Sequence, residues 1–110
     1  MKDLSYPNEK FQRAIRSLFM DAPIRSRILD AFMCFHPVRP SDFDDRWLRK
    51  KYEGLVRQLT AFRGEPRREG YIHATLDRLS DAEVAAIAGR IVELAFAIEA
   101  AAAKYYASEN

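Results

Sequence analysis

The regular spacing of apolar residues after position 80 constrains this chain most. Between Ser80 and Tyr106, apolar side chains recur at alternating steps of three and four residues: Val84, Ile87, Ile91, Leu94, Ile98, Ala101 and Tyr105. Such spacing is typical of a helix that packs along a seam. Ser80, with Glu83 three residues later, forms the sequence pattern of a capping box. We therefore expect one helix over residues 80–106, about 40 Å long at about 1.5 Å per residue.

The same helix carries a second apolar stripe beside the seam: Ala85, Ala88, Val92, Ala95, Phe96, Ala103 and Tyr106. Together the two stripes cover roughly 200° of the circumference, about twice the arc of an ordinary surface helix. Either the helix is central in a monomeric bundle, or a second copy covers its outer stripe. We expect a two-fold dimer with the seam facing its own chain, because soluble monomers rarely expose large apolar patches. The expected dimer interface consists of Ala88, Val92, Ala95, Phe96, Glu99 and Ala103.

The rest of the chain is also expected to be helical, because no segment alternates with the period of two that strands require. Helices are expected over residues 8–22, over residues 23–35, from a cap at Ser41 to residue 62, and, shorter, over residues 71–79. Gly64 and Pro66 are expected to end the third helix, with a charged loop over residues 63–70. Gly89 could instead mark a helix-turn-helix, but the apolar period continues through it. The sequence thus predicts a compact all-α bundle of four to five helices, a single domain over residues 1–110.

Charge is unevenly distributed although the net charge of the 110 residues is only +2. Residues 46–68 hold eight basic side chains against Glu53 and Glu65, a balance of +6, whereas residues 79–110 hold two basic against five acidic ones, a balance of −3. The basic segment could be a solvated helix face with internal pairs such as Glu53 with Arg57. It could also be a contact for an acidic protein, or a surface that neutralises nucleic-acid phosphates.

Two aromatic residues near this segment could either cover the top of the core or anchor a partner. Phe43 and Trp47 are expected to lie one turn apart on a single helix, away from its apolar face. Exposed aromatic and arginine side chains dominate many protein interfaces. The expected partner-binding residues are Phe43, Trp47, Arg46, Lys50 and Arg57.

The sequence shows no set of residues with the spacing of a catalytic or metal site. A single Cys excludes an internal disulfide framework, and Cys34 is expected to be a buried apolar residue. Cys34 and His36 are too few for a zinc site, which uses four ligands. The acids at 42, 44 and 45 are explained as helix caps. We expect no cofactor, no metal and no enzymatic activity.

No apolar run reaches the roughly 18 residues of a membrane span, and the first seven residues lack the apolar stretch of a signal peptide. A reduced, cytoplasmic setting without a membrane partner is therefore expected. The hypothesis from sequence is a small, non-enzymatic regulatory or adaptor protein that acts by protein–protein interaction as a homodimer. The alternative is a nucleic-acid-binding helical regulator that uses the basic stretch 46–68.

Overall fold

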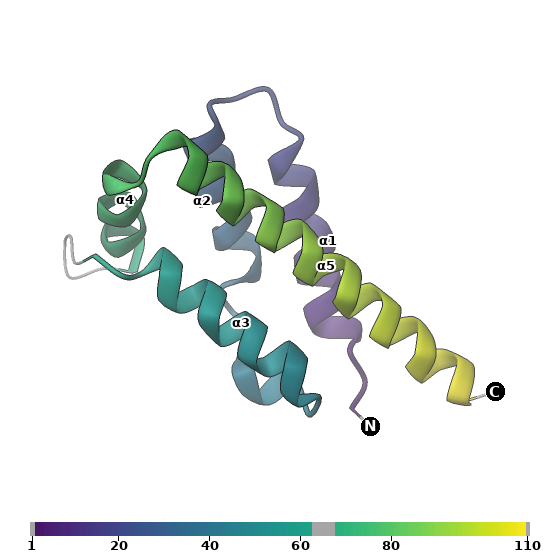
Figure 1. The fold of residues 1–110 in the computed structure, drawn as a ribbon. Coiled ribbons are helices and arrows are strands. Elements are labelled where there is room, and N and C mark those ends of the chain that lie inside the picture. Colours follow the sequence, from purple (N-terminus) through teal and green to yellow (C-terminus); the bar gives the residue numbers. More distant parts are fainter. Residues whose placement is uncertain (1, 63–67, 110) are drawn as a thin grey trace.

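A computed structural model describes residues 2–62 and 68–109, which form a bundle of helices (Figure 1). In chain order the elements are α1 (Ser5–Leu18), α2 (Ile24–Phe35), the 3₁₀ helix η1 (Pro40–Asp42), α3 (Arg46–Leu59), α4 (Arg68–Arg78) and α5 (Asp81–Glu109). No strand occurs in these two ranges. The prediction of an all-α fold with a long C-terminal helix is confirmed. The expected loop over residues 63–70, with Gly64 and Pro66, falls mostly outside the described residues.

The start of α5 is fixed by the capping box that the sequence predicts. The Ser80 hydroxyl accepts from the Glu83 N–H at 3.1 Å, and the Glu83 carboxylate accepts from the Ser80 N–H at 3.0 Å. The backbone hydrogen bond from Ser80, and then its hydroxyl, hold the pKa of Glu83 below its ordinary value. The helix continues through Gly89, so the alternative of a helix-turn-helix at that glycine is wrong.

The segment before α3 differs from the prediction of a helix capped by Ser41. The Asp42 carboxylate accepts from the Arg39 N–H at 2.8 Å, which closes the short turn of η1. The backbone is then extended at Phe43, with φ −114° and ψ 120°. Asp42 and Asp45 therefore cap two separate elements. Phe43, which was expected on a helix, lies in the connection between them.

The α-helix itself begins after Asp45, whose carboxylate accepts from the Leu48 N–H at 2.9 Å. The first helix also differs at its ends, since α1 begins at Ser5 and ends at Leu18. Pro23 precedes α2 as its N-cap residue, without a side-chain hydrogen bond. α1 thus begins three residues and ends four residues before the predicted positions, whereas α2 agrees with its prediction to within one residue.

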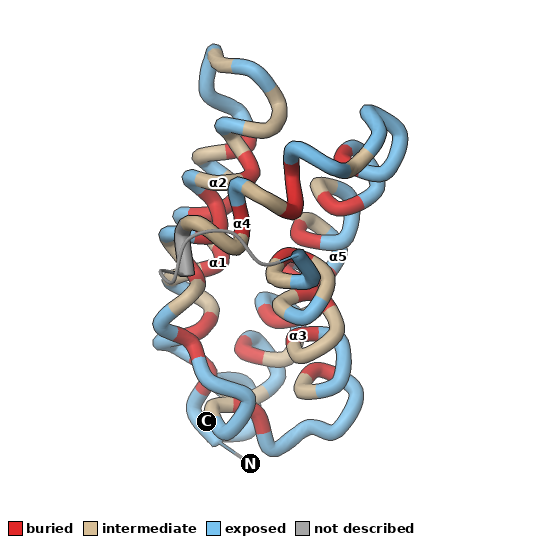
Figure 2. The backbone as a smooth tube through the Cα atoms, turned by 90° about the vertical axis from the view of Figure 1, so that its left-hand side faces the viewer, coloured by how far each residue is buried: buried red, intermediate tan, exposed pale blue. Residues whose placement is uncertain are grey.

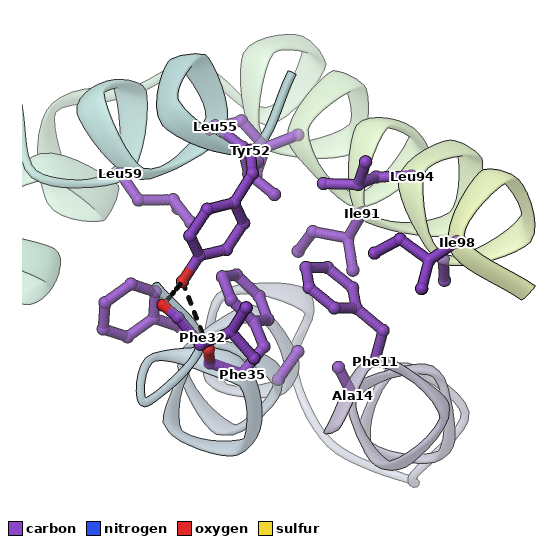
Figure 3. Close-up of a cluster of buried hydrophobic side chains, with 14 of the residues drawn as sticks. Phe11, Ala14, Phe32, Phe35, Tyr52, Leu55, Leu59, Ile91, Leu94 and Ile98 are labelled. Atoms are coloured by element: carbon purple, nitrogen blue, oxygen red, sulfur yellow. Dashed lines mark hydrogen bonds between the residues drawn. The ribbon is translucent and has the colours of Figure 1, made fainter. Parts of the chain in front are cut away.

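Aromatic side chains from α1, α2, α3 and the segment before α3 form the centre of the core (Figure 3). Phe11 stacks on Phe35 with ring centroids 4.7 Å apart. Tyr52 meets the edges of both rings at about 6 Å. Phe32 packs against Phe35 at 5.3 Å, and Phe43 against Tyr52 at 5.6 Å. Each such pair adds about 0.5–1.5 kcal/mol beyond the area that it buries.

Tyr52 also carries a polar group into this apolar region. Its ring is almost fully buried, and its hydroxyl donates towards the carbonyl oxygens of Val38 and, at 3.3 Å, Phe35. Figure 3 shows the two interactions as dashed lines. The Phe35 carbonyl also accepts from the Val38 N–H at 2.9 Å. The Tyr52 hydroxyl therefore chiefly satisfies the Val38 carbonyl, just after the end of α2.

α5 supplies the other wall of the core with the seam that its spacing predicts. Five seam residues are buried: Val84, Ile87, Ile91, Leu94 and Ile98. The helix packs against α1, α2 and α3, and its C-terminal end extends past the bundle towards the N-terminus of the chain (Figure 1). Figure 2 shows the buried positions of α5 along its inner side only, with exposed positions between them.

α4 is the short helix that the sequence predicts near residues 71–79. It contributes Ile72, Thr75 and Leu76 to the buried residues. The Thr75 hydroxyl accepts from the Phe62 N–H at 3.0 Å and donates to the Tyr71 carbonyl at 2.8 Å. This buried hydroxyl therefore links the residues after α3 to α4.

The corner between α4 and α5 is held by one arginine of α2. Arg25 donates to the carbonyls of Leu76 and Leu79, at 3.0 and 2.7 Å, and to the Asp81 carboxylate at 2.8 Å. The guanidinium thus satisfies two carbonyls at the end of α4 and complements an acid in the first turn of α5.

We predict that Tyr52→Phe destabilises the protein by about 1–3 kcal/mol, because the Val38 carbonyl loses the donor that Tyr52 supplies while the packing is kept. Urea denaturation followed by circular dichroism measures the change. Tyr6→Phe is the matched control, because Tyr6 is half-exposed and its hydroxyl has no hydrogen bond within the described residues. An equal effect of both substitutions would contradict this role of Tyr52.

Candidate functional site

The outward face of α3 carries a ridge of three cations, Arg46, Lys50 and Arg57. They lie within about 40° of one another around the helix axis, and all three are exposed. None forms an ion pair with another described residue, so the expected pair of Glu53 with Arg57 is absent there. The ridge separates two hollows, one towards α5 and one towards the end of α2.

The first hollow is a slot of about 330 Å³ between α3 and α5. α3 contributes Trp47, Lys50, Lys51, Gly54 and Leu55, and α5 contributes Arg90, Glu93 and Leu94. We call these eight residues the α3–α5 slot. Two of the five predicted partner-binding residues, Trp47 and Lys50, are therefore brought together, and residues of a distant helix join them.

Trp47 forms one end of the α3–α5 slot and is an exposed aromatic residue. Its side chain is 49% exposed, and the Lys51 ammonium lies 5.4 Å from the ring centroid. Phe43, which was expected beside Trp47, does not lie on this surface. Phe43 is completely buried against Tyr52 because the extended backbone turns its side chain inward. The prediction that Phe43 contacts a partner is wrong.

Gly54 lies two turns after Trp47 on the same side of α3. A Cβ atom at this position would meet no atom within 4 Å, so close packing does not require a glycine here. Its backbone is helical, so no special dihedral angle requires one either. Glycine within a helix costs about 1 kcal/mol relative to alanine, and no contact in the fold offsets that cost.

The other end of the slot is closed by a link between the two helices. The Arg90 guanidinium of α5 donates to the Gln58 side-chain oxygen of α3. The slot therefore holds three cations, Lys50, Lys51 and Arg90, against the carboxylate of Glu93. Buried Leu55 and Leu94 form its apolar base.

One of the basic side chains of α3 is engaged within the chain. The Arg49 guanidinium donates to the Phe43 carbonyl at 2.9 and 3.0 Å and so holds the connection before α3. The positions of Arg63 and Arg67 lie outside the described residues, as does the side chain of Arg68. The cations that α3 itself exposes are Arg46, Lys50, Lys51 and Arg57.

The second hollow is larger, about 950 Å³, and lies between the end of α2, η1 and α3. Arg57 lines it, which separates this cation from Trp47. The other charged residues around it are Arg39, Asp42 and Glu53, so its two arginines are balanced by two carboxylates. Its lining gives no clear charge preference.

Some residues of the dimer interface that was expected on α5 are buried within their own chain, and the others are exposed. Ala95 is completely buried within its own chain, and Ala88 and Val92 are partly buried. Phe96, at 61% exposed, and Glu99 and Ala103 remain exposed. The prediction that Ala95 faces a partner is wrong.

The reason is that α1 covers one flank of the second stripe. Gln12 of α1 donates to the Glu99 carboxylate at 3.5 Å, and Tyr106 hydrogen-bonds Ser5 at the start of α1. Glu99 and Tyr106 lie on the same side of α5 as Ala88 and Ala95, within about 40° around the axis. The remaining outward face of α5 consists of Ala82, Ala86, Gly89, Glu93, Phe96, Ala100, Ala103 and Ala107, all exposed.

The residues considered for chemistry lie apart from one another. Cys34 is partly buried, with its sulfur 3.6 Å from the Ser17 hydroxyl. His36 stacks on Phe32 at the end of α2 with centroids 5.8 Å apart, and His73 is exposed on α4. In residues 2–62 and 68–109, no group of three or more His, Cys, Asp or Glu side chains is placed to hold a metal ion.

None of the helices in the described ranges combines the length and the apolar character needed to cross a membrane. Comparison of the chain with protein-family models, with curated protein sequences and with solved structures gives no match.

Sequence reasoning missed Gly54, Arg90 and Glu93 as members of the slot. An isolated glycine inside an amphipathic helix was the one signal at Gly54, since such a residue is unfavourable without a packing or functional reason. No signal in the sequence places Arg90 and Glu93 beside Trp47, because they belong to another helix.

We predict that Gly54→Ala stabilises the protein by about 0.5–1 kcal/mol, because it raises helix propensity where a methyl group has free space. Gly89→Ala on α5 is expected to raise the stability by a similar amount, since a Cβ atom there also meets no atom within 4 Å. Chemical denaturation measures both. A loss of stability at Gly54 alone would mean that the base of the slot is closed.

Proposed function

We propose that this protein is a small, non-enzymatic regulatory or adaptor protein that binds another protein through the α3–α5 slot. The observation that supports this most is the half-exposed Trp47 at the edge of a hollow that three cations also line. Tryptophan next to a pocket, surrounded by charged residues, has the composition of an interface hot spot. The slot has the concave shape into which a partner side chain can insert.

A protein partner fits this surface better than a nucleic acid. The slot contains a carboxylate, Glu93, and its base is formed by Leu55 and Leu94 rather than by cations. Arg49 and Arg90 are engaged in hydrogen bonds within the chain, which leaves fewer cations for phosphates. Nucleic-acid binding by the ridge is the second candidate, and a steep dependence on salt would reveal it.

We further propose self-association through the outward face of α5. In that face, exposed small residues recur at steps of three and four, with Phe96 near the middle. This spacing permits a helix of a second copy to approach closely. A two-fold axis near residues 94–95 would place the Phe96 side chains of both copies close to it.

The partner prediction is tested by capture from a lysate of the native host, with quantitative mass spectrometry. We expect Trp47→Ala to weaken retention of the specific partner about thirtyfold, the effect of losing roughly 2 kcal/mol at a hot spot. Phe19→Ala is the matched control, because Phe19 is an aromatic residue that is 83% exposed and lies outside the slot. Equal retention by both variants would contradict binding at the slot.

The dimer prediction uses two adjacent residues of α5. Phe96→Glu is expected to give a folded monomer, because it places charges near a two-fold axis while the monomer core is untouched. Ala95→Arg is expected to unfold the chain instead, because its side chain is fully buried. Light scattering and circular dichroism distinguish these results. A wild-type protein that is monomeric at high concentration would exclude self-association.

A further inference from the structure

The α3–α5 slot has a definite length and a definite distribution of charge. From Trp47 to Leu55 it follows eight steps of α3, about 12 Å at about 1.5 Å per residue. Lys50 and Lys51 stand near the Trp47 end, and Arg90 stands at the Gln58 end. Three cations and one carboxylate give the slot a net charge of +2.

The two lysines are accessible to a ligand. Neither Lys50 nor Lys51 forms an ion pair with another residue in ranges 2–62 and 68–109, and Lys51 contacts only the ring of Trp47 among the interactions found there. Lysine beside an exposed tryptophan ring gains about 0.5–1 kcal/mol from the cation–π contact, and that contact leaves its ammonium donors free for a carboxylate.

The space above Gly54 lies between these two groups of cations. No atom lies within 4 Å of the point where a side chain would begin at this glycine, and Leu55 and Leu94 lie at the base beside it. Apolar surface gains about 25 cal/mol per Å² when it leaves water. An apolar side chain seated there would bury its own surface together with the exposed part of the Trp47 ring, since the two leucines are already buried.

Resting on the proposed function, we infer that the α3–α5 slot binds an acidic segment of its protein partner, with one apolar side chain over Gly54 and carboxylates towards Lys50, Lys51 and Arg90. The positive potential of the slot favours acidic residues and disfavours basic ones. The apolar base distinguishes such a segment from a phosphate backbone, which offers charge without an apolar side chain to insert.

A selection from random twelve-residue peptides displayed on phage tests this inference. The full-length protein is the bait, and peptides that also bind Gly54→Leu are removed, because leucine at this position fills the space over the helix. Enriched sequences are expected to carry Asp or Glu on both sides of one apolar residue. Enrichment of neutral or basic sequences, or no enrichment at all, would overturn the inference.

Fluorescence anisotropy with synthetic peptides then measures separately what the acidic side chains and the apolar side chain contribute to binding. Replacing Asp and Glu by Asn and Gln in the best peptide, or its apolar residue by Gly, is expected to weaken binding about tenfold or more. Both changes are made in the peptide and not in the protein. The comparison of affinities therefore remains valid even if a slot variant of the protein folds poorly. Equal affinity of the amide peptide would show that charge does not select the ligand.

On the protein side, Gly54→Leu is compared with Ser26→Leu, which places the same side chain at an exposed position of α2 outside the slot and outside the outward face of α5. Only Gly54→Leu and the double variant Lys50→Gln/Lys51→Gln are expected to weaken the acidic peptide. A single-stranded oligothymidylate of equal charge that binds as tightly would overturn the inference in favour of nucleic acid. If capture of the partner depends on Trp47 but acidic peptides fail, the proposed function stands and this inference alone is lost.

Discussion

α2 ends inside the bundle, and the carbonyl group of Val38, just after the helix, receives a hydrogen bond from the side chain of Tyr52, which also reaches the Phe35 carbonyl at 3.3 Å. This interaction, together with the packing of the same ring against Phe11 and Phe35, fixes the rotation of α3 about its axis. Since Tyr52 must point inward, Trp47, Lys50 and Gly54 on the other sides of the helix point towards solvent and α5. The position of the α3–α5 slot thus follows from a hydrogen-bonding requirement in the core.

The parts of the fold that depend on residues close together in the sequence could be predicted. The capping box of Ser80 and Glu83 and the seam of α5 are local patterns, and both are present. The start of α3 could not be predicted in this way, because Ser41, Asp42 and Asp45 are all acceptable caps. The choice between them is settled by burial of Phe43 against the distant Tyr52, which no local pattern contains.

The candidate site was predictable only in its α3 half. Helical spacing alone indicated that Trp47 and Lys50 lie outside the core of that helix. Their neighbours Arg90 and Glu93 depend on how α5 crosses α3, and this crossing is a property of the packed chain. The same limitation explains Ala95. Two apolar stripes were visible on α5, but the position of α1 decides how much of the second stripe is covered, and that position is not encoded in the periodicity of α5.

The clamp that Arg25 forms at the corner of α4 and α5 has a consequence for local opening of the protein. α4 contributes few buried residues, and it is attached through this guanidinium and the Thr75 hydroxyl. Opening of α4 requires release of these two attachments and exposure of Ile72 and Leu76, but none of the rings packed around Tyr52 belongs to α4. The chain therefore has two levels of stability. We therefore expect amide protons of α4 to exchange with solvent through partial opening, and those of α1, α2 and the middle of α5 to exchange only when the whole bundle unfolds.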